Sequence, residues 1–203
     1  MIELRGKAVA DAHKAILQEK VAAVGNSVIT MAVLLVGDDH GAHMYATFME
    51  KTAKNFGYGF VLKQLPKTAT NDEVIAALQA LNTDDAVHGI LPLMPMPKHI
   101  DTEALIDMLD PKKDIDGLTT YNIGLVTAGK GGFAPCTAKA CMAILNHYDI
   151  PVEGKHVVVV GRSQVIGKPV ALMALGARLG STAYTHATEY RNTLGLLQRI
   201  LVK

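Results

Sequence analysis

Short apolar runs alternate along this chain with longer segments in which apolar residues recur at helical spacing. The runs predict buried strands at Met31–Val36, Phe60–Leu65, Val87–Leu91, Val157–Val160 and near Ala183. The helical spacing predicts helices at Gly6–Val24, Ala42–Phe56, Asn71–Leu81, up to Leu109, Thr137–Tyr148, after Gly167, and from Tyr190 to the terminus. Strands that alternate with helices are typical of parallel sheets, so the pattern predicts an α/β fold.

Residues that favour helix ends mark several boundaries. Asn71 and Asp101 have side chains that accept hydrogen bonds from the first N–H groups of a helix, so each predicts a helix start. Gly57 predicts a helix end, because glycine adopts the left-handed backbone that closes many helices. The segment from residue 116 to 135 is rich in Gly and Thr and predicts a loop. We therefore expect two domains, residues 1–118 and 119–203.

The composition is that of an ordinary soluble globular protein. Of the 203 residues, 49% are hydrophobic and 19% are charged. The net charge is +1 with both signs mixed along the chain, which gives no basic patch for nucleic acid and no polybasic segment for an anionic membrane. Residues 1–5 do not form a signal-peptide pattern, and no apolar run reaches membrane-spanning length. We expect a cytoplasmic protein.

Metal binding and a disulfide framework are not expected. Cys136 and Cys141 are the only cysteines, and they lack the companions that a zinc site needs. The eight histidines are scattered without the spacing of metal ligands. The sequence therefore predicts reduced thiols and no metal.

The strand Val157–Val160 runs directly into Gly161-Arg162-Ser163-Gln164-Val165-Ile166-Gly167-Lys168-Pro169, which predicts a glycine turn and a helix start. Gly161 lets the backbone approach a ligand, and the helix would offer unpaired N–H groups and a positive dipole end to a phosphate. Dinucleotide folds bind their pyrophosphate at such a junction. The glycine spacing matches neither the usual dinucleotide motif nor a Walker loop. A tight turn without a ligand would give the same pattern, so this motif alone leaves both interpretations open.

Four segments occur in the order and spacing of one family. They are residues 89–101 (Gly-Ile-Leu-Pro-Leu-Met-Pro-Met-Pro-Lys-His-Ile-Asp), 113–117 (Lys-Asp-Ile-Asp-Gly), 135–137 (Pro-Cys-Thr) and the glycine loop 161–169. On these motifs the chain resembles the bifunctional methylenetetrahydrofolate dehydrogenase/methenyltetrahydrofolate cyclohydrolases. The resemblance begins at Leu4 and continues to about His186, so it covers most of the chain.

The resemblance implies an N-terminal α/β folate domain with a parallel sheet, then a Rossmann-like domain for NADP or NAD, with the active site in the cleft between them. It implies oxidation of methylenetetrahydrofolate to methenyltetrahydrofolate and hydrolysis of that product to formyltetrahydrofolate, within one-carbon metabolism and purine biosynthesis. It also implies a homodimer. After Gly161 only one further strand candidate precedes Lys203, so we expect a partial Rossmann-like domain. Residues 185–188, where the family distinguishes NADP from NAD, depart from its pattern and leave that choice open.

The resemblance also implies the roles of individual residues. Tyr45 would stack on the pterin or the adjoining ring, Asp116 would accept hydrogen bonds from the pterin's amino edge, and Pro95 would line the same substrate site. A phenol ring is an aromatic platform, and a carboxylate can accept two N–H bonds from such an edge. Thr137 would face the nicotinamide. The cofactor would be held by Gly161, Arg162, Ser163, Gly167, Lys168 and Pro169.

Three positions depart from the family's pattern. The family has a lysine four residues after the tyrosine, which transfers protons and polarises the reacting centre of the folate; here that position is Met49. The glutamine that tunes this lysine corresponds to Leu93, and a serine three residues before the tyrosine corresponds to Ala42. Three polar positions have become apolar together, which indicates a coordinated loss.

The cyclohydrolase step should suffer most, because hydrolysis needs a group that activates water and a general acid–base typically contributes about 10²–10⁴-fold. Hydride transfer depends mainly on orientation of the two rings, which the remaining residues could still supply.

An alternative is a catalytically inactive folate-binding or regulatory paralogue that pairs with a full-length homologue. A truncated remnant of marginal stability is the third possibility, and NADP-dependent melting would separate it from the other two.

Overall fold

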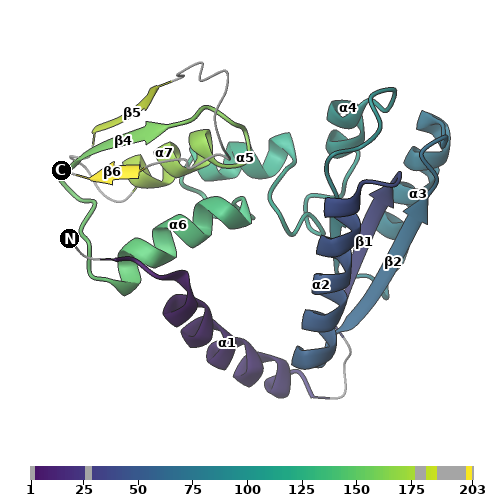
Figure 1. Ribbon diagram of the computed structural model, residues 1–203, viewed down its shortest axis with the longest axis horizontal. Coiled ribbons are helices and arrows are strands. Elements are labelled where there is room, and N and C mark those ends of the chain that lie inside the picture. The colour runs from purple at the N-terminus through teal and green to yellow at the C-terminus, as the bar shows by residue number, and fades with distance from the viewer. Residues whose placement is uncertain (1–2, 26–28, 177–181, 187–199, 203) are drawn as a thin grey trace. The chain divides into compact units, whose positions relative to one another are not determined.

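The computed structural model describes residues 3–25, 29–176, 182–186 and 200–202 (Figure 1). The chain divides into two compact units. The first unit is residues 12–115, and the second unit is residues 1–11 with 116–203. Helix α1, Gly6–Ala23, contributes residues to both. Within the described residues, no helix is long and apolar enough to cross a membrane.

The first unit is built on a parallel sheet of three strands in the order β2-β1-β3. The central strand β1 is Thr30–Val36, β2 is Gly59–Leu65 and β3 is Gly89–Pro92. Helix α2, His40–Phe56, joins β1 to β2, and α3, Asn71–Thr83, joins β2 to β3 (Figure 1). The short helix α4, Thr102–Asp107, follows β3. Strand, helix and strand alternate as the sequence predicts, which confirms the α/β fold of this unit.

Both faces of β1 are covered by apolar side chains, in two separate clusters. On one face Ala32, Leu34 and Val36 pack with residues of α3 and α4, among them Leu78 and Leu105. On the other face Met31, Val33 and Leu35 pack with a second set that includes Ala42, Ala46, Leu91 and Leu93, with Met49, Tyr58, Phe60 and Ile115 at its margin. We call this second set the α2-side cluster. Side chains alternate between the two faces of a strand, so one strand supports both clusters.

Helix boundaries in the first unit follow local hydrogen bonds. Gly57 closes α2 in the left-handed region (φ +78°), and its N–H donates to the Ala53 carbonyl at 2.9 Å, as predicted. Asp101 caps α4 by accepting from the Ala104 N–H at 3.1 Å, also as predicted. The prediction that Asn71 caps α3 is wrong by one residue.

The cap of α3 is Thr70. Its hydroxyl accepts from the Glu73 N–H at 3.3 Å, while Glu73 Oε2 accepts from the Thr70 N–H at 2.7 Å, which completes a capping box. Asn71 instead joins two loops, because its Oδ1 accepts from the Asp101 N–H and its Nδ2 donates to the His99 carbonyl. Two adjacent residues both favour a cap, and the glutamate three residues after Thr70 decides between them.

The second unit contains a sheet in the order β5-β4-β6, in which β6 is Ile200–Val202. Strand β4 is His156–Val160, and β5, Thr182–His186, lies parallel to it. Its helices are α5 (Thr120–Thr127), α6 (Cys136–His147) and α7 (Gly167–Gly176). Val157 and Val159 of β4 pack with apolar residues of α6 and α7. This second α/β unit agrees with the predicted fold class.

Two predictions for the second unit are wrong. The segment 116–135 is not all loop, because it contains α5. Thr119 caps this helix, and its hydroxyl accepts a hydrogen bond from the Asn122 N–H. The predicted terminal helix does not extend to the terminus, because Ile200–Val202 forms β6, antiparallel to β4. These β-branched and aliphatic residues satisfy their backbone groups against β4. Residues 190–199 of that predicted helix lie outside the described residues.

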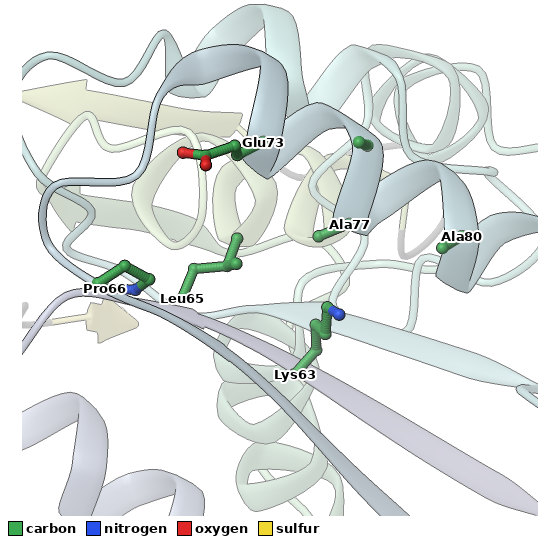
Figure 2. Close-up of a pocket in the computed structure, with 7 residues that line it drawn as sticks. Lys63, Leu65, Pro66, Glu73, Ala77 and Ala80 are labelled. Atoms are coloured by element: carbon green, nitrogen blue, oxygen red, sulfur yellow. The ribbon is translucent and has the colours of Figure 1, made fainter.

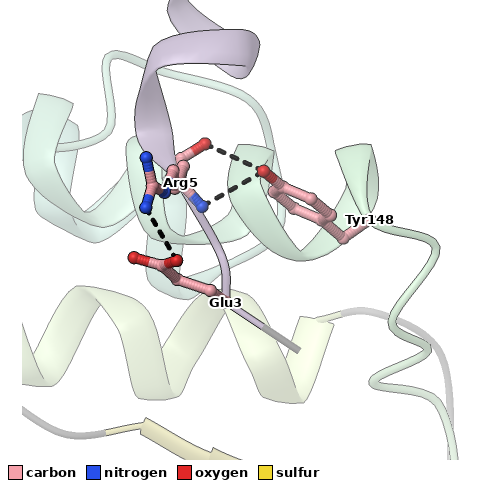
Figure 3. Close-up of polar contacts among 3 residues, drawn as sticks. All are labelled: Glu3, Arg5 and Tyr148. Atoms are coloured by element: carbon pink, nitrogen blue, oxygen red, sulfur yellow. Dashed lines mark hydrogen bonds and ion pairs between the residues drawn. The ribbon is translucent and has the colours of Figure 1, made fainter. Parts of the chain in front are cut away.

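The N-terminal segment is tied to the end of α6 by a single tyrosine (Figure 3). The Tyr148 hydroxyl accepts a hydrogen bond from the Arg5 N–H and donates one to the Arg5 carbonyl, both at 3.1 Å. The Arg5 guanidinium pairs in turn with Glu3 at 2.9 Å. One phenol therefore satisfies both backbone groups of a residue that precedes α1.

Lys113, in the Lys-Asp-Ile-Asp-Gly motif, closes the C-terminal end of α3. Its Nζ donates to the carbonyl oxygens of Leu81, Asn82 and Asp84, at 3.2, 2.7 and 2.7 Å. The last carbonyls of a helix have no partner within the helix, and a cation is favourable there. The motif lysine thus stabilises the fold of the first unit.

We predict that Lys113→Met lowers the free energy of unfolding by about 1–2 kcal/mol, because three carbonyls lose a charged donor while the aliphatic stem is kept. Urea unfolding followed by circular dichroism measures the change. Lys112→Met is the matched control, since Lys112 is adjacent in the sequence and exposed. Its free energy of unfolding should stay within about 0.5 kcal/mol of the parent. Equal stability of the two variants would show that the Lys113 bonds contribute nothing.

Candidate functional site

The junction between β4 and α7 forms the tight glycine turn that the sequence predicts. Gly161 has φ +150°, which L side chains rarely adopt. A Cβ on Gly167 would lie 2.4 Å from the Gly161 carbonyl oxygen and 2.9 Å from the Arg162 nitrogen. The loop therefore closes on itself at Gly167, and only glycine fits there.

Ser163 caps the start of α7. Its Oγ accepts from the Ile166 N–H at 3.1 Å and from the Gly167 N–H at 3.2 Å, and its carbonyl accepts from the Lys168 N–H at 3.0 Å. Pro169 has no N–H. The prediction that this helix offers unpaired N–H groups is therefore wrong for its first turn, because a residue of the loop itself has taken them.

The loop still has the chemistry to hold an anion. Ser163 Oγ accepts two bonds, so its own hydroxyl proton remains to be donated. Arg162 and Lys168 are exposed cations beside the loop, and Lys168 Nζ lies 3.3 Å from Gln164 Oε1. A phosphate would accordingly be bound by the cations, the Ser163 hydroxyl and the backbone of residues 161–165, with the α7 dipole behind them.

Asp116 lies at the start of α6. Its Oδ1 accepts from the Cys136 N–H at 3.1 Å. The residue at the cap position, Pro135, makes no side-chain bond to the helix, so a carboxylate from a distant turn takes that place. The structure thus brings Asp116 to the Pro-Cys-Thr turn, where Thr137 is exposed in the first turn of α6.

Helix α2 carries Tyr45, which is 51% exposed on the side of the helix next to Met49. The three positions at which we expect a departure from the family pattern are brought together by the fold. Ala42 and Leu93 are buried, at 6% and 5% exposure, and Met49 is half-buried against the same α2-side cluster. Pro95 is exposed two residues after Leu93, and the peptide bond that precedes it is cis.

Sequence reasoning missed Asn122 of α5. Its side chain is 2% exposed, and its Oδ1 accepts from the Phe133 N–H at 3.2 Å. A buried amide that fixes a loop is a candidate for holding a site in shape. The one signal in the sequence is Thr119, three residues earlier, which favours a helix start.

The metal-ligating side chains, the cysteines and the groove found in the described residues do not form a second candidate site. No set of three His, Cys, Asp or Glu side chains among them could hold a metal ion. Burial raises the pKa of the Cys141 thiol, while Cys136 is exposed. A groove between β2 and α3 has a volume of about 350 Å³. In Figure 2, Lys63 and Leu65 lie on its strand side and Ala77 and Ala80 on its helix side. None of the predicted site residues lines it.

Comparison with known proteins covers both units. The tetrahydrofolate dehydrogenase/cyclohydrolase catalytic domain family matches residues 4–116, and the NAD(P)-binding domain of the same family matches residues 135–202. The bifunctional protein FolD of Sulfurovum sp. is 39% identical over 168 residues, which are 83% of this chain and 59% of that protein. FolD of Campylobacter concisus is 42% identical over 158 residues, 78% of this chain and 56% of that protein. The chain spans less than two thirds of the length of these relatives.

Solved structures of FolD and methylenetetrahydrofolate dehydrogenase proteins are also similar to this chain. The bifunctional FolD of Campylobacter jejuni superposes with a TM-score of 0.84 at 34% identity, covering 92% of this chain and 67% of that one. A 5,10-methylenetetrahydrofolate dehydrogenase of the silkworm Bombyx mori gives 0.86 at 31% identity, over 93% and 68%. FolD of Trypanosoma brucei, solved with NADP cofactor and inhibitor, gives 0.82 at 29% identity, over 91% and 64%.

We predict that Gly167→Ala lowers the free energy of unfolding by about 1–3 kcal/mol, because its Cβ would press on the backbone of residues 161 and 162. Gly176→Ala at the end of α7 is the control, since a Cβ there meets nothing within 4 Å and alanine favours the helix. Thermal unfolding of the two variants should move in opposite directions. A Gly167→Ala chain as stable as the parent would contradict the closed loop.

Proposed function

This chain belongs to the tetrahydrofolate dehydrogenase/cyclohydrolase family, and we propose that it oxidises 5,10-methylenetetrahydrofolate to 5,10-methenyltetrahydrofolate with NADP. The observation that carries the proposal is that both family domains match while the glycine loop keeps a shape and charge suited to a dinucleotide phosphate. We assign folate binding to residues 1–118 and cofactor binding to residues 119–203. A homodimer and a cytoplasmic location remain predictions.

The cofactor-binding residues fit a dinucleotide. Gly161 carries no side chain at the turn, so a phosphate can approach its backbone, and Gly167 lets the loop close on itself. Arg162 and Lys168 place positive charge beside it, and the Ser163 hydroxyl can donate. When bound, NADP supplies the acceptor for the hydride that leaves the methylene carbon. Thr137 is proposed to face its nicotinamide, and Pro169 shapes the first turn of α7.

The folate is proposed to be held by Tyr45, Pro95 and Asp116. The exposed Tyr45 ring offers an apolar face for stacking, and the Asp116 carboxylate accepts N–H groups of the pterin edge. Neither role requires a proton to move. Holding the methylene carbon in line with a hydride acceptor is an orientation effect, so this half of the reaction is compatible with the residues present.

Hydrolysis of the methenyl product is proposed to be weak or absent. Ala42, Met49 and Leu93 belong to one apolar cluster, so at these positions the chain has no group that could activate water or shuttle its proton. The same observation favours the second candidate, a folate-binding protein without turnover that pairs with a full-length homologue. In the chemistry of the chain itself, the two candidates differ in whether hydride transfer survives.

A spectrophotometric assay of the purified chain with methylenetetrahydrofolate and NADP, repeated with NAD, decides between them. Methenyltetrahydrofolate and reduced cofactor should appear together, and the methenyl product should accumulate. A folded chain that binds tetrahydrofolate but forms neither product is the binding protein of the second candidate. Rapid loss of the methenyl product would contradict the proposed loss of hydrolysis.

We predict that Met49→Lys with Leu93→Gln raises the rate of methenyltetrahydrofolate hydrolysis at least tenfold and changes hydride transfer less, because a proton-transferring group typically contributes about 10²–10⁴-fold. Thr47→Lys is the matched control, since it places a lysine on the exposed, opposite side of α2. Hydrolysis is followed by the decay of methenyl absorbance. An unchanged rate in a folded double variant would show that these two positions are not what hydrolysis lacks.

A further inference from the structure

Two segments of the second unit meet at Asp116. Gly117 has φ +63°, and a Cβ there would lie 2.2 Å from the Phe133 carbonyl oxygen and 2.8 Å from the Ala134 carbonyl carbon. The backbone of residues 133–134 therefore lies directly on Gly117. This close approach places the start of α6, two residues later, beside the Asp116 side chain.

The Asp116 carboxylate is fixed by that helix. Its Oδ1 accepts from the Cys136 N–H at 3.1 Å, at the first residue of the 12-residue helix α6. Negative charge is favourable at a helix N-terminus, so the bond is reinforced by the helix dipole. Each carboxylate oxygen can accept two hydrogen bonds, which leaves one on Oδ1 and both on Oδ2 for N–H groups of a ligand.

Asn122 holds the segment that leads to this bond. Its buried Oδ1 accepts from the Phe133 N–H at 3.2 Å, three residues before Cys136. The backbone N–H of Asn122 donates to the hydroxyl of Thr119, the cap of α5, at 3.2 Å. A chain of contacts therefore runs from α5 through Phe133 and Gly117 to the Asp116 carboxylate.

We propose that Asn122 and the backbone N–H of Cys136 are positioning groups for Asp116, which hold its carboxylate in the orientation that receives the pterin edge of the folate. The inference rests on the proposed function, since that assigns the folate to Asp116. A carboxylate already held in one orientation loses less conformational freedom when the ligand binds, so its bonds contribute more to affinity. Neither positioning group needs to touch the folate.

Cys136→Pro tests the N–H directly. Proline removes this N–H together with the thiol side chain, it is favoured at the first position of a helix, and Pro135 at φ −50° and ψ 128° has the backbone that a residue before proline requires. We expect the dissociation constant for tetrahydrofolate, measured by anaerobic titration calorimetry, to rise about tenfold. The KM for methylenetetrahydrofolate should rise in parallel, with kcat within about threefold and NADP affinity unchanged, as for loss of one charged hydrogen bond. Cys136→Ala keeps the N–H and separates the side chain from the backbone, so it should bind tetrahydrofolate within about twofold of the parent.

A double-mutant cycle with Asp116→Ala distinguishes positioning from a general structural role. If the N–H acts through the carboxylate, Cys136→Pro adds no further loss of tetrahydrofolate affinity in the Asp116→Ala chain. An equal loss in both backgrounds, or parental affinity in the single variant, overturns the inference. Asn122→Ala in the same cycle gives the decision if Cys136→Pro melts below the assay temperature. A parent chain that binds no tetrahydrofolate overturns the proposed function and this inference with it, whereas a parent that binds and a variant that binds equally overturn the inference alone.

Discussion

Burial of β1 from Met31 to Val36 is the constraint on which the first unit depends. From Met31 to Val36 no residue is more than 7% exposed, so every backbone group of the strand must be paired and both of its faces must be covered. Strands β2 and β3 meet the first requirement in parallel register, and the two apolar clusters meet the second. Because parallel strands end at the same edge, the start of α2 and the loop that carries Leu93 and Pro95 follow from that edge. The proposed folate residues of this unit are therefore placed by the burial of one strand.

The α2-side cluster connects this constraint to the chemistry. It covers one face of β1, and it includes Ala42, Met49 and Leu93, the positions that the family resemblance marks as polar. A polar group in such a place must find a hydrogen-bond partner or destabilise the fold. Replacing all three by apolar residues removes that requirement in one step, which is consistent with the common exchange of activity for stability at active sites. Replacing only one of the three polar residues would leave the groups that it had bonded buried without a hydrogen-bond partner.

The sequence predicts the elements of this chain better than it predicts the bonds between them. The apolar runs and the caps at Gly57 and Asp101 are local signals, and the strands and helices that depend on them are found. Helix α5 is missed because its Gly and Thr residues favour turns, while the bond that its buried Asn122 accepts from the Phe133 N–H joins residues 11 positions apart. Strand β6 is missed because an apolar segment fits a strand as well as a helix until β4 is known to lie beside it. The bond from Asp116 to α6 has no local signal, since the two residues meet only through the fold.

Two of the proposed ligand-binding residues are also helix caps. Ser163 accepts N–H groups at the start of α7, so that helix end is not open to a ligand as the sequence pattern suggests, and Asp116 accepts the first N–H of α6. The ligand would instead bind the oxygen atoms and the hydroxyl proton that the helices hold in place. Removing either side chain alters a helix start and a ligand contact together, so the loss of function that follows has two causes. A change at the backbone donor, the Cys136 N–H, leaves the Asp116 carboxylate present. It therefore separates the positioning of the carboxylate from its binding of the ligand.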